Sequence, residues 1–390
     1  MSNLVLVVWF VLLLTFVGFS GLYYFFMRRF SLRQWNVKRD KDYRPMVTIL
    51  IPAHNEEKVI GLKLKNLMKL DYPKNKLQII VIDDGSTDNT LREIREFQKA
   101  GSAITVEVLV YSERMGKSAS LNLALKNAEG ELVVVSDADC FLSSGVLREA
   151  LPFLSDPDVG AVTGLEVLLN PETSWVTKTE KSYNDVVHTI RIGESKVHST
   201  ILFQGGFGAY KRSLLDQFDV QADDSGTALN IVQKGARTLL LPEAVYFTMF
   251  ASVWRGKFSI KLRRATQLIR LWFKSLRLFL DGTLLLPKKI FLPESFLYLV
   301  NPFVFICLIA FSTLVMVKYP VFLVVFSAFL FGCLLFKRVG ILFVELVQNN
   351  IILLLAILCG VSGRRFSFWS SSGSARSDFG RNLLESKGLI

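Results

Sequence analysis

Residues 47–57 read VTILIPAHNEE, and residues 77–90 read LQIIVIDDGSTDNT. Each stretch opens with a short, β-branched apolar run and closes with a polar cluster that contains acidic side chains. Similar runs occupy residues 105–111 and 132–136, and residues 58–70 carry apolar side chains at helical spacing. Short β-branched runs favour strands, and strands that alternate with helices favour a largely parallel sheet. The sequence therefore predicts an α/β domain.

The polar loops after the first two predicted strands are the first candidates for chemistry. In parallel α/β sheets, ligands bind beyond the carboxyl ends of the strands. The carboxylate of Asp84 can accept hydrogen bonds from a nucleobase or a ribose, and Gly85 permits a tight turn. Ser86 and Thr87 can cap the helix that follows. Taken alone, this loop is equally well explained as a plain turn-and-cap motif.

The next two loops supply cations and a pair of carboxylates. The loop SERMGKSASLNLAL places Arg114 and Lys117 around Gly116, which suits a diphosphate. The fourth predicted strand ends in Asp137 and Asp139, and alternation along an extended strand would direct both carboxylates to the same side. Such a pair can share a magnesium or manganese ion, which would neutralise a diphosphate leaving group. A solvated strand end is the alternative.

The chain is too apolar for an ordinary soluble protein. It has 390 residues, 51% of them hydrophobic, and a mean hydropathy of +0.37. Its net charge of +12 and its pI near 9.5 are compatible with nucleic acid, an acidic membrane or a phosphorylated ligand. The basic residues concentrate beside apolar segments, which favours the membrane. The four cysteines indicate neither a disulfide framework nor a CxxC zinc site.

Four apolar segments are candidates for membrane helices, at about 4–26, 294–317, 320–336 and 341–360. Arg28, Arg29 and further basic residues follow the first segment, so the positive-inside rule places the next domain in the cytosol. A cleavable signal peptide is the alternative, but the charge polarity is the reverse of one. Glu345 in the last segment should face other helices or a wet cavity. The topology of that segment stays open, because a fourth crossing would put the basic tail outside.

Residues 254–280 interleave basic and apolar side chains at helical spacing, which is typical of an amphipathic helix at a membrane surface. A solvated helix packed on the α/β domain is the alternative. The layout that we expect has an N-terminal transmembrane helix at 1–29, a cytosolic α/β domain at 30–250, amphipathic interfacial helices at 251–293, C-terminal transmembrane helices at 294–362 and a tail at 363–390.

The ordered set IPAHNEE, DDGS, RMGKSASLN and SDAD resembles the nucleotide-sugar half of the family 2 glycosyltransferases. The resemblance covers roughly residues 46–275 and implies a GT-A (Rossmann-like) catalytic domain. The flanking apolar helices make the chain similar to the membrane-bound, cellulose-synthase-like branch. His54 departs from the pattern, because these enzymes often have tyrosine there. The resemblance implies that Pro52, Ala53, Glu56 and Asp84 surround the nucleotide, that Lys117 lies near it, and that Asp137 and Asp139 hold the metal and the diphosphate.

Two downstream motifs extend the resemblance. The segment FQGGFGAYKRS resembles the glycine-rich stretch of the family, where Gly205 and Gly206 would let the backbone approach the sugar and the acceptor. Asp223 and Asp224 stand where many relatives have Glu-Asp. The resemblance implies that Asp224 is the general base, that Asp223 binds the acceptor, and that one displacement inverts the configuration. An N-cap role for either aspartate on the following helix is the alternative.

Cellulose-synthase-like relatives carry a QxxRW motif on an interfacial helix, where it holds the diphosphate and the acceptor. Gln267 and Arg270 keep the QxxR spacing, but one extra residue intervenes before the tryptophan. Alignment of Lys261 with Arg264 is an alternative that keeps only the cation. We therefore expect Arg270 or Arg264 near the diphosphate. The altered motif does not support processive synthesis.

The predicted reaction is the inverting, metal-dependent transfer of a sugar from a nucleotide-sugar donor to a lipid-linked acceptor. GDP-mannose is the first candidate donor, Mn²⁺ or Mg²⁺ the expected cofactor, and a polyprenyl phosphate or a lipid-linked glycan the expected acceptor. We expect a multi-pass protein of the plasma membrane whose catalytic domain is cytosolic and does not bind nucleic acid. The alternatives are a processive polysaccharide synthase that uses a UDP-sugar and a non-catalytic membrane scaffold. The oligomeric state stays open.

Overall fold

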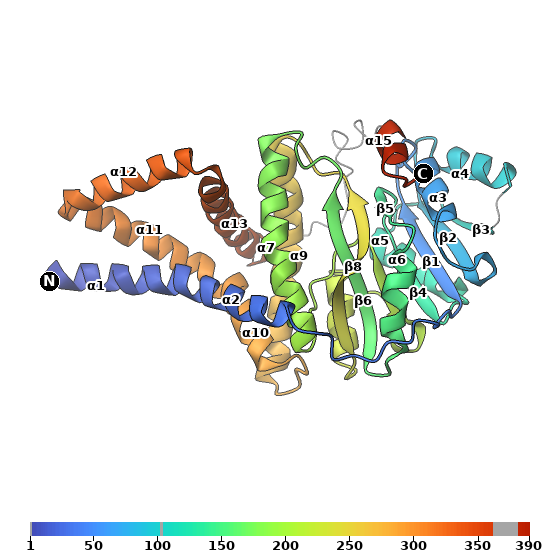
Figure 1. The fold of residues 1–390 in the computed structure, drawn as a ribbon, viewed down its shortest axis with the longest axis horizontal. Helices are drawn as coiled ribbons and strands as arrows, with labels where there is room; N and C mark the ends of the chain where they lie inside the picture. Colours follow the sequence, from blue (N-terminus) through green and yellow to red (C-terminus); the bar gives the residue numbers. More distant parts are fainter. Residues whose placement is uncertain (1, 102–103, 362–380) are drawn as a thin grey trace.

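An eight-stranded sheet forms the centre of the α/β domain (Figure 1). The structure, a computed structural model, describes residues 2–101, 104–361 and 381–390. The strand order is β3-β2-β1-β4-β7-β6-β8-β5, in which β1 to β4 are parallel and β7 runs antiparallel to β4. All four predicted strands are confirmed. The strands are β1 (Val47–Ala53), β2 (Leu77–Asp84), β3 (Val106–Tyr111), β4 (Leu132–Val135), β5 (Cys140–Leu142), β6 (Val159–Leu168), β7 (Gly208–Lys211) and β8 (Arg237–Thr248).

Helices cover both faces of the sheet because its central strands are apolar on both faces. Every residue of β1 is buried, and alternate side chains enter opposite clusters: Ile49 and Ile51 join one cluster, and Leu50 joins the other. The helix predicted at residues 58–70 is confirmed, with shorter bounds, as α3. The helices of this domain are α3 (Ile60–Met68), α4 (Thr90–Lys99), α5 (Lys117–Ala124), α6 (Val146–Ala150), α7 (Trp175–Val197), α8 (Ser225–Val232) and α9 (Trp254–Leu280).

Apolar helices project from one side of the α/β domain (Figure 1). Three helical stretches are long and apolar enough to cross a membrane, namely Leu4–Ser31, Lys288–Lys318 and Lys337–Gly360, and α12 is a shorter apolar helix. Their large hydrophobic side chains are widely exposed, as lipid-facing residues would be. The elements are α1 (Ser2–Leu13), the π-helical turn η1 (Leu14–Gly18), α2 (Phe19–Ser31), α10 (Lys288–Ser295), the π-helical turn η6 (Phe296–Val300), α11 (Asn301–Lys318), α12 (Pro320–Leu335) and α13 (Lys337–Val361).

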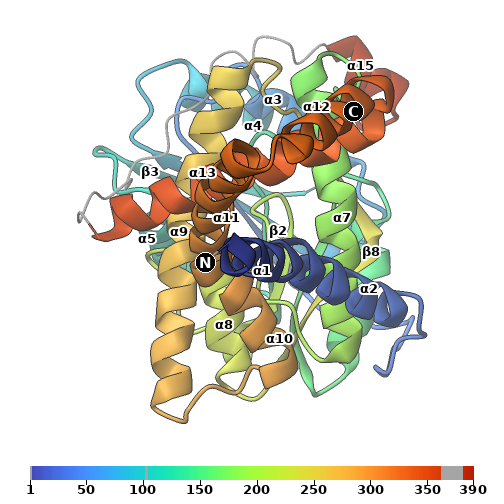
Figure 2. The same cartoon turned by 90° about the vertical axis from the view of Figure 1, so that its left-hand side faces the viewer.

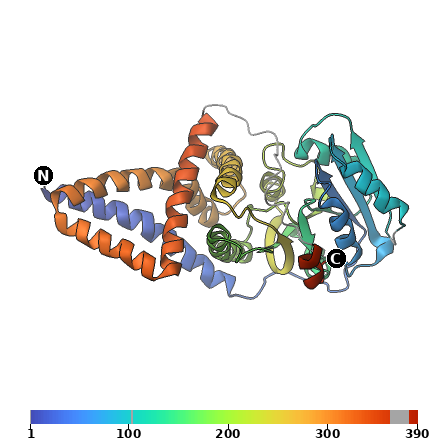
Figure 3. The ribbon, with the colours of Figure 1, turned by 90° about the horizontal axis from the view of Figure 1, so that it is seen from above.

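The helix α13 differs from α1, α11 and α12 in direction. Figure 3 shows it lying across their common direction, beside α7 and α9. The Lys261 ammonium lies 2.8 Å from Glu345 of α13 and 3.0 Å from Glu180 of α7, and Lys257 pairs with the same two carboxylates. We call these four buried side chains the charge cluster. Glu345 thus faces other helices, as predicted, and Lys257 and Lys261 of α9 are buried with it. The position of α9 at a membrane surface stays a prediction.

The carboxyl-terminal residues return to the α/β domain. Leu384 of α15 (Arg381–Ser386) and the following Leu389 are buried against Phe141 at the domain surface. The Asn66 side chain donates a hydrogen bond to the Leu389 carbonyl oxygen at 2.7 Å. Part of the predicted tail is therefore helical and docked. Its serine-rich stretch and the basic residues before it lie outside the described residues.

Candidate active site

The loops that follow β1 and β2 are hydrogen-bonded to each other. The Asn55 N–H donates to Ser86 Oγ at 3.0 Å, and the Thr87 N–H donates to Asn55 Oδ1 at 2.8 Å. Farther along, the Asn89 N–H donates to Glu57 Oε2 at 3.0 Å. Because β1 and β2 are parallel neighbours, their carboxyl ends meet at one edge of the sheet. The two loops therefore form a single polar rim, as their position in the sequence predicted.

The first loop buries most of the side chains that the resemblance assigned to the nucleotide. Pro52 and Ala53 are the last two residues of β1 and are buried. Glu56 is only 1% exposed. The Nδ1 atom of His54 lies 2.8 Å from the carbonyl oxygen of Asp84, which ties this ring to the second loop. A role for these residues in nucleotide binding stays a prediction.

Asp84 holds the third loop. Its carboxylate oxygens accept hydrogen bonds from the Met115 N–H at 2.8 Å and from the Gly116 N–H at 2.9 Å. Gly116 precedes α5 with a φ of 91°, a conformation that strongly favours glycine. The sequence predicted a contact from Asp84 to a nucleobase or a ribose, and that contact stays a prediction. In the structure Asp84 instead fixes the loop that carries the cations.

Lys117 connects the first half of the site to the second. Its ammonium lies 2.7 Å from Asp137 and 2.7 Å from Asp223. Burial alone would lower the pKa of Lys117, but the two carboxylates outweigh it and hold that pKa well above its usual value. Gly205 packs beside this pair, since a Cβ there would lie 2.7 Å from Asp137 Oδ2 and 2.9 Å from Lys117 Nζ. Residues far apart in the sequence thus meet at one point.

Asp137 and Asp139 lie in a turn rather than on a strand. The prediction of an extended segment is wrong, because β4 ends at Val135 and the Cys140 N–H donates to the Asp137 carbonyl oxygen at 3.2 Å, which reverses the chain. The turn still brings the two carboxylates together: one ligand atom from each of them and the sulfur of Cys140 lie within 4.8 Å of one another. Carboxylate oxygens suit Mg²⁺ or Mn²⁺. Burial raises the pKa of the Cys140 thiol, so its neutral sulfur is a poor ligand.

A buried lysine below this turn was missed by the sequence analysis. Lys63 of α3 is fully buried, and its ammonium donates to Ser136 Oγ at 2.7 Å and to the Cys140 carbonyl oxygen at 2.6 Å. Ser136 Oγ in turn donates to the Gly206 carbonyl oxygen at 2.7 Å. Burial lowers the pKa of Lys63 to about 8. Lys63 therefore links the aspartate turn to the glycine-rich segment, and a lysine in an amphipathic helix gives no sequence signal of that role.

Asp224 combines two features that the sequence left as alternatives. It is the N-cap of α8, where its Oδ1 accepts a hydrogen bond from the Ser225 N–H at 2.6 Å. Burial, and next the neighbouring charge of Asp223, raise the pKa of Asp224 to about 6, while Lys117 acts in the opposite direction. A carboxylate with that pKa is mostly ionised at neutral pH and is a stronger base than an ordinary aspartate. The capping role therefore does not exclude proton abstraction.

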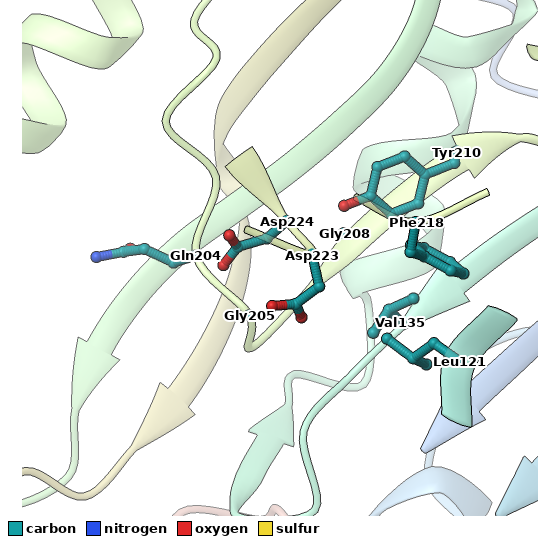
Figure 4. Close-up of a pocket in the computed structure, with 9 residues that line it drawn as sticks. All are labelled: Leu121, Val135, Gln204, Gly205, Gly208, Tyr210, Phe218, Asp223 and Asp224. Atoms are coloured by element: carbon teal, nitrogen blue, oxygen red, sulfur yellow. The ribbon is translucent and has the colours of Figure 1, made fainter. Parts of the chain in front are cut away.

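Figure 4 shows a pocket at the centre of the site. The carboxylates of Asp223 and Asp224 lie on the side of the pocket near Gln204 and Gly205. Apolar side chains of Leu121, Val135 and Phe218 close the opposite side. The acidic pair is thus set against an apolar wall, which is consistent with the raised pKa of Asp224.

Gly206 has a packing reason to lack a side chain. A Cβ at this position would lie 2.0 Å from the Tyr246 ring. The hydroxyl of Tyr246 donates to Gln204 Oε1 at 3.2 Å, which fixes the ring beside the glycine-rich segment. From the sequence, Gly205 and Gly206 were predicted to allow close approach of a sugar. The structure shows close approach of protein side chains, and contact with the acceptor stays a prediction.

The helix α9 presents arginines to the acidic groups of the site. Arg264 interacts most with Glu166 and Glu180 and more weakly with Asp224, whereas Arg263, which the sequence did not single out, interacts with Asp137 and Asp223. Lys261, the partner of Arg264 in the alternative alignment, belongs to the charge cluster. The predicted cation near the reaction centre therefore has Arg264 as its better-supported candidate. Gln267 and Arg270 lie farther along α9, both half-buried, and their role stays a prediction.

Comparison with known proteins gave matches in sequence and in structure. Residues 48–218 match the family model "Glycosyl transferase family 2". A β-monoglucosyldiacylglycerol synthase of Nostoc sp. is 36% identical over 134 residues, which are 34% of this chain and 29% of that protein. An N-acetylglucosaminyltransferase of Rhizobium meliloti is 26% identical over 250 residues, which are 60% of this chain and 58% of that protein. The chain thus spans less than two thirds of the length of these relatives.

One solved structure resembles nearly the whole chain. It is a mannosyltransferase from Pyrobaculum calidifontis in complex with GDP-Man and Mn²⁺. The similarity has a TM-score of 0.80 at 29% sequence identity and covers 93% of this chain and 100% of that one. The match includes the α/β domain and extends into the apolar helices, since it leaves only a small part of the chain unpaired.

Proposed function

The α/β domain of this chain belongs to glycosyltransferase family 2 and has a GT-A-like fold, and we propose that the chain transfers one sugar from GDP-mannose to a lipid-linked acceptor with inversion of configuration. The single observation that carries the proposal is the meeting of Lys117, Asp137 and Asp223 at one point. It joins the residues expected to bind the donor to those expected to bind the acceptor.

The donor side of the proposal rests on Asp137, Asp139 and Lys117. The two carboxylates converge at a turn and offer the hard oxygen ligands that Mn²⁺ or Mg²⁺ prefers. A bound ion of this kind would neutralise charge on the diphosphate. Lys117 can exchange its pair with Asp137 for one with a phosphate oxygen. The mannosyltransferase solved with GDP-Man and Mn²⁺ supports this choice of donor and metal.

The transfer step rests on Asp224. Its carboxylate takes the proton of the acceptor hydroxyl or phosphate oxygen as that oxygen bonds to the anomeric carbon. The bond from the anomeric carbon to the diphosphate oxygen breaks, and its electron pair leaves with the nucleotide. Asp223, held by Lys117 at 2.7 Å, orients the acceptor. Arg264 lies in electrostatic range of Asp224 and favours its ionised form.

We place the α/β domain in the cytosol and the apolar helices in the plasma membrane. Basic residues that follow α2 support the cytosolic side. The residues around Leu389 dock on the α/β domain, so an even number of crossings must separate α9 from the carboxyl terminus. The hairpin of α11 and α12 supplies two crossings. In this proposal α13 lies at the interface, where Glu345 keeps its lysine partners.

The alternative is a processive synthase that uses a UDP-sugar, and the N-acetylglucosaminyltransferase relatives are the observation that favours it. The same experiment tests both. The full chain in lipid nanodiscs is given GDP-mannose, UDP-glucose or UDP-N-acetylglucosamine with a membrane-lipid extract, with Mn²⁺, Mg²⁺ or a chelator. Products are then weighed by mass spectrometry.

The proposal predicts a lipid product that gains one hexose from GDP-mannose, and only when a divalent metal is present. A ladder of masses from a UDP-sugar would favour the synthase. Transfer that continues in chelator would contradict the metal site, and a chain that transfers no sugar from any donor would overturn the proposed function.

A further inference from the structure

A buried arginine near the catalytic pocket has two guanidinium nitrogens without acceptors among the described residues. Arg191 of α7 is 7% exposed, and within the described ranges its Nε and Nη1 have no hydrogen-bond partner. His188, one turn earlier, is also 7% exposed; its Nε2 has no partner in the same part of the chain, while its ring lies within reach of Gln204 in the wall of the catalytic pocket. Residues three apart lie on one face of a helix. A buried cation without an acceptor is costly, so these groups indicate a ligand that the described residues do not supply.

The neighbours of Arg191 come from both parts of the molecule. On one side it acts electrostatically on Tyr246 of β8, whose hydroxyl donates to Gln204 in the wall of the catalytic pocket. On the other side it lies in electrostatic range of Tyr298 of η6, which stacks on Trp272 of α9 with ring centroids 5.6 Å apart. Arg191 therefore interacts with one residue beside the pocket of Asp224 and with one in a helical stretch that is long enough to cross a membrane.

Figure 2 looks at the molecule from the side of the apolar helices. In this view α7 and α9 run roughly parallel to each other and stand apart, with α1, α11 and α13 in front. Trp272 of α9 is fully buried, and its Nε1 is a further N–H without an acceptor among the described residues. Trp272 stacks on Tyr298 and Arg191 interacts with it electrostatically, so α7 and α9 each carry an N–H donor near this ring.

The acidic residues near Arg191 are already engaged. Glu194 accepts hydrogen bonds from Tyr23 at 2.7 Å and from Thr200 at 2.7 Å, one on each carboxylate oxygen. Glu294 of α10 lies beside Glu194 and interacts with it. Neither carboxylate accepts a hydrogen bond from Nε or Nη1 of Arg191 within the described residues, so these two nitrogens are open to an anion.

We propose that Arg191, with His188 and Trp272 beside it, binds the phosphate of a lipid-phosphate acceptor. This inference rests on the proposed function and narrows its acceptor to an anionic lipid. A guanidinium offers N–H groups in a planar fork that matches phosphate oxygens. The apolar helices beside η6 suit the hydrocarbon chain. A neutral lipid such as diacylglycerol has no group that would use the charge of Arg191.

The first test compares matched acceptors. The full chain is placed in nanodiscs that contain a polyprenyl phosphate, the corresponding polyprenol or diacylglycerol. KM for each lipid and Kd for GDP-mannose are measured for the native protein and for Arg191→Gln, Arg191→Lys and His188→Gln. Arg191→Gln should raise KM for the polyprenyl phosphate about tenfold to hundredfold, because a hydrogen bond to a charged group is lost. Arg191→Lys should recover part of this loss, and Kd for GDP-mannose should not change.

The neutral lipids separate a ligand contact from a structural role. Native protein that uses polyprenol or diacylglycerol as well as polyprenyl phosphate would overturn the proposal. An equal loss with all three lipids in Arg191→Gln would do the same. If Arg191→Gln binds GDP-mannose poorly or unfolds early, Arg191→Lys is measured in its place, and a KM for polyprenyl phosphate equal to the native one would then refute the contact.

The second test needs no sugar transfer. Without donor, polyprenyl phosphate should raise the melting temperature of the native protein and leave that of Arg191→Gln unchanged. Inorganic phosphate at the same concentration is the control, and equal protection by it would overturn the assignment to a lipid. A chain that binds polyprenyl phosphate through Arg191 but glycosylates none of the lipids would contradict the proposed function and not this site.

Discussion

The donor loops and the junction of α7 with α9 both collect polar side chains near the same pocket, but they satisfy them in different ways. In the donor loops, both oxygens of Asp84 accept backbone N–H groups, and Lys117 lies between two aspartates. At the junction, Arg191 and His188 are buried but keep nitrogen atoms without hydrogen-bond partners among the described residues. The chain thus preorganises one half of the site and leaves the other to be completed by a ligand.

The donor loops and the junction meet at Asp223 and Asp224. A substitution there is expected to have the largest effect on turnover. Asp224→Asn keeps the size and much of the hydrogen bonding of the side chain but removes its basicity. Turnover should fall by about 10²- to 10⁴-fold while donor affinity stays near native. Asp223→Asn is the matched control and should cost less, since Asp223 only orients the acceptor. A native rate for Asp224→Asn, with a low rate for Asp223→Asn, would mean that the base is the other carboxylate.

The junction also contains the charge cluster. A substitution that breaks this cluster should lower the free energy of unfolding. Glu345→Gln leaves the two buried lysines with Glu180 as their one carboxylate. Removal of one partner from a buried ion pair costs about 3–5 kcal/mol of unfolding free energy. Denaturant unfolding in detergent measures it. Glu385→Gln, at an exposed pair with Arg381, should change stability by less than about 1 kcal/mol. Similar costs for both variants would contradict the anchoring of α13 by the charge cluster.

A substitution in the donor loops should act on donor binding and not on the acceptor. Asp84→Asn gives up one of the two acceptors for the Met115 and Gly116 N–H groups. The affinity for GDP-mannose with Mn²⁺, measured by calorimetry, should fall about tenfold to hundredfold. Asp71→Asn, at an exposed pair with Arg148, should leave it unchanged. If Asp84→Asn instead raised KM for the lipid and kept the native affinity for GDP-mannose, the donor loops would not be the part of the site that binds the donor.

The smallest predicted effect is the dependence of the rate on pH. The base must be ionised, and the pKa of Asp224 is about 6. The value of kcat/KM should therefore fall as the pH drops through 6, by up to about tenfold per pH unit below it. Asp223 raises that pKa, so the midpoint should move to lower pH in Asp223→Asn. If the pH midpoint of kcat/KM in Asp223→Asn equals the native midpoint, Asp223 does not raise the pKa of Asp224.

The donor half was largely predictable from sequence, because its motifs are short and each follows a strand. The prediction of an extended segment at Asp137 and Asp139 was wrong in conformation. A backbone hydrogen bond from Cys140 closes a turn there, and residue pattern alone does not reveal such a bond. The prediction that the two carboxylates lie close together is nevertheless confirmed.

Three basic side chains on helices could not be predicted in the same way. Lys63, Arg191 and Arg263 each sit on a helix whose pattern is that of an ordinary amphipathic segment. Their roles depend on which elements pack against those helices, and the partners come from strands and helices distant in the chain. Long-range packing of this kind leaves no local signal. Only the tertiary arrangement identifies these residues.

We propose that the donor loops bind the nucleotide sugar and that the junction of α7 with α9 binds the lipid phosphate. This division is tested most directly by measuring the binding of both ligands to two variants. Binding of GDP-mannose with Mn²⁺ and binding of polyprenyl phosphate are each determined for Asp139→Asn and for Arg191→Gln in nanodiscs. Asp139→Asn should weaken the nucleotide sugar and spare the lipid phosphate, and Arg191→Gln should do the reverse. Two variants that weaken both ligands to the same extent would contradict the account.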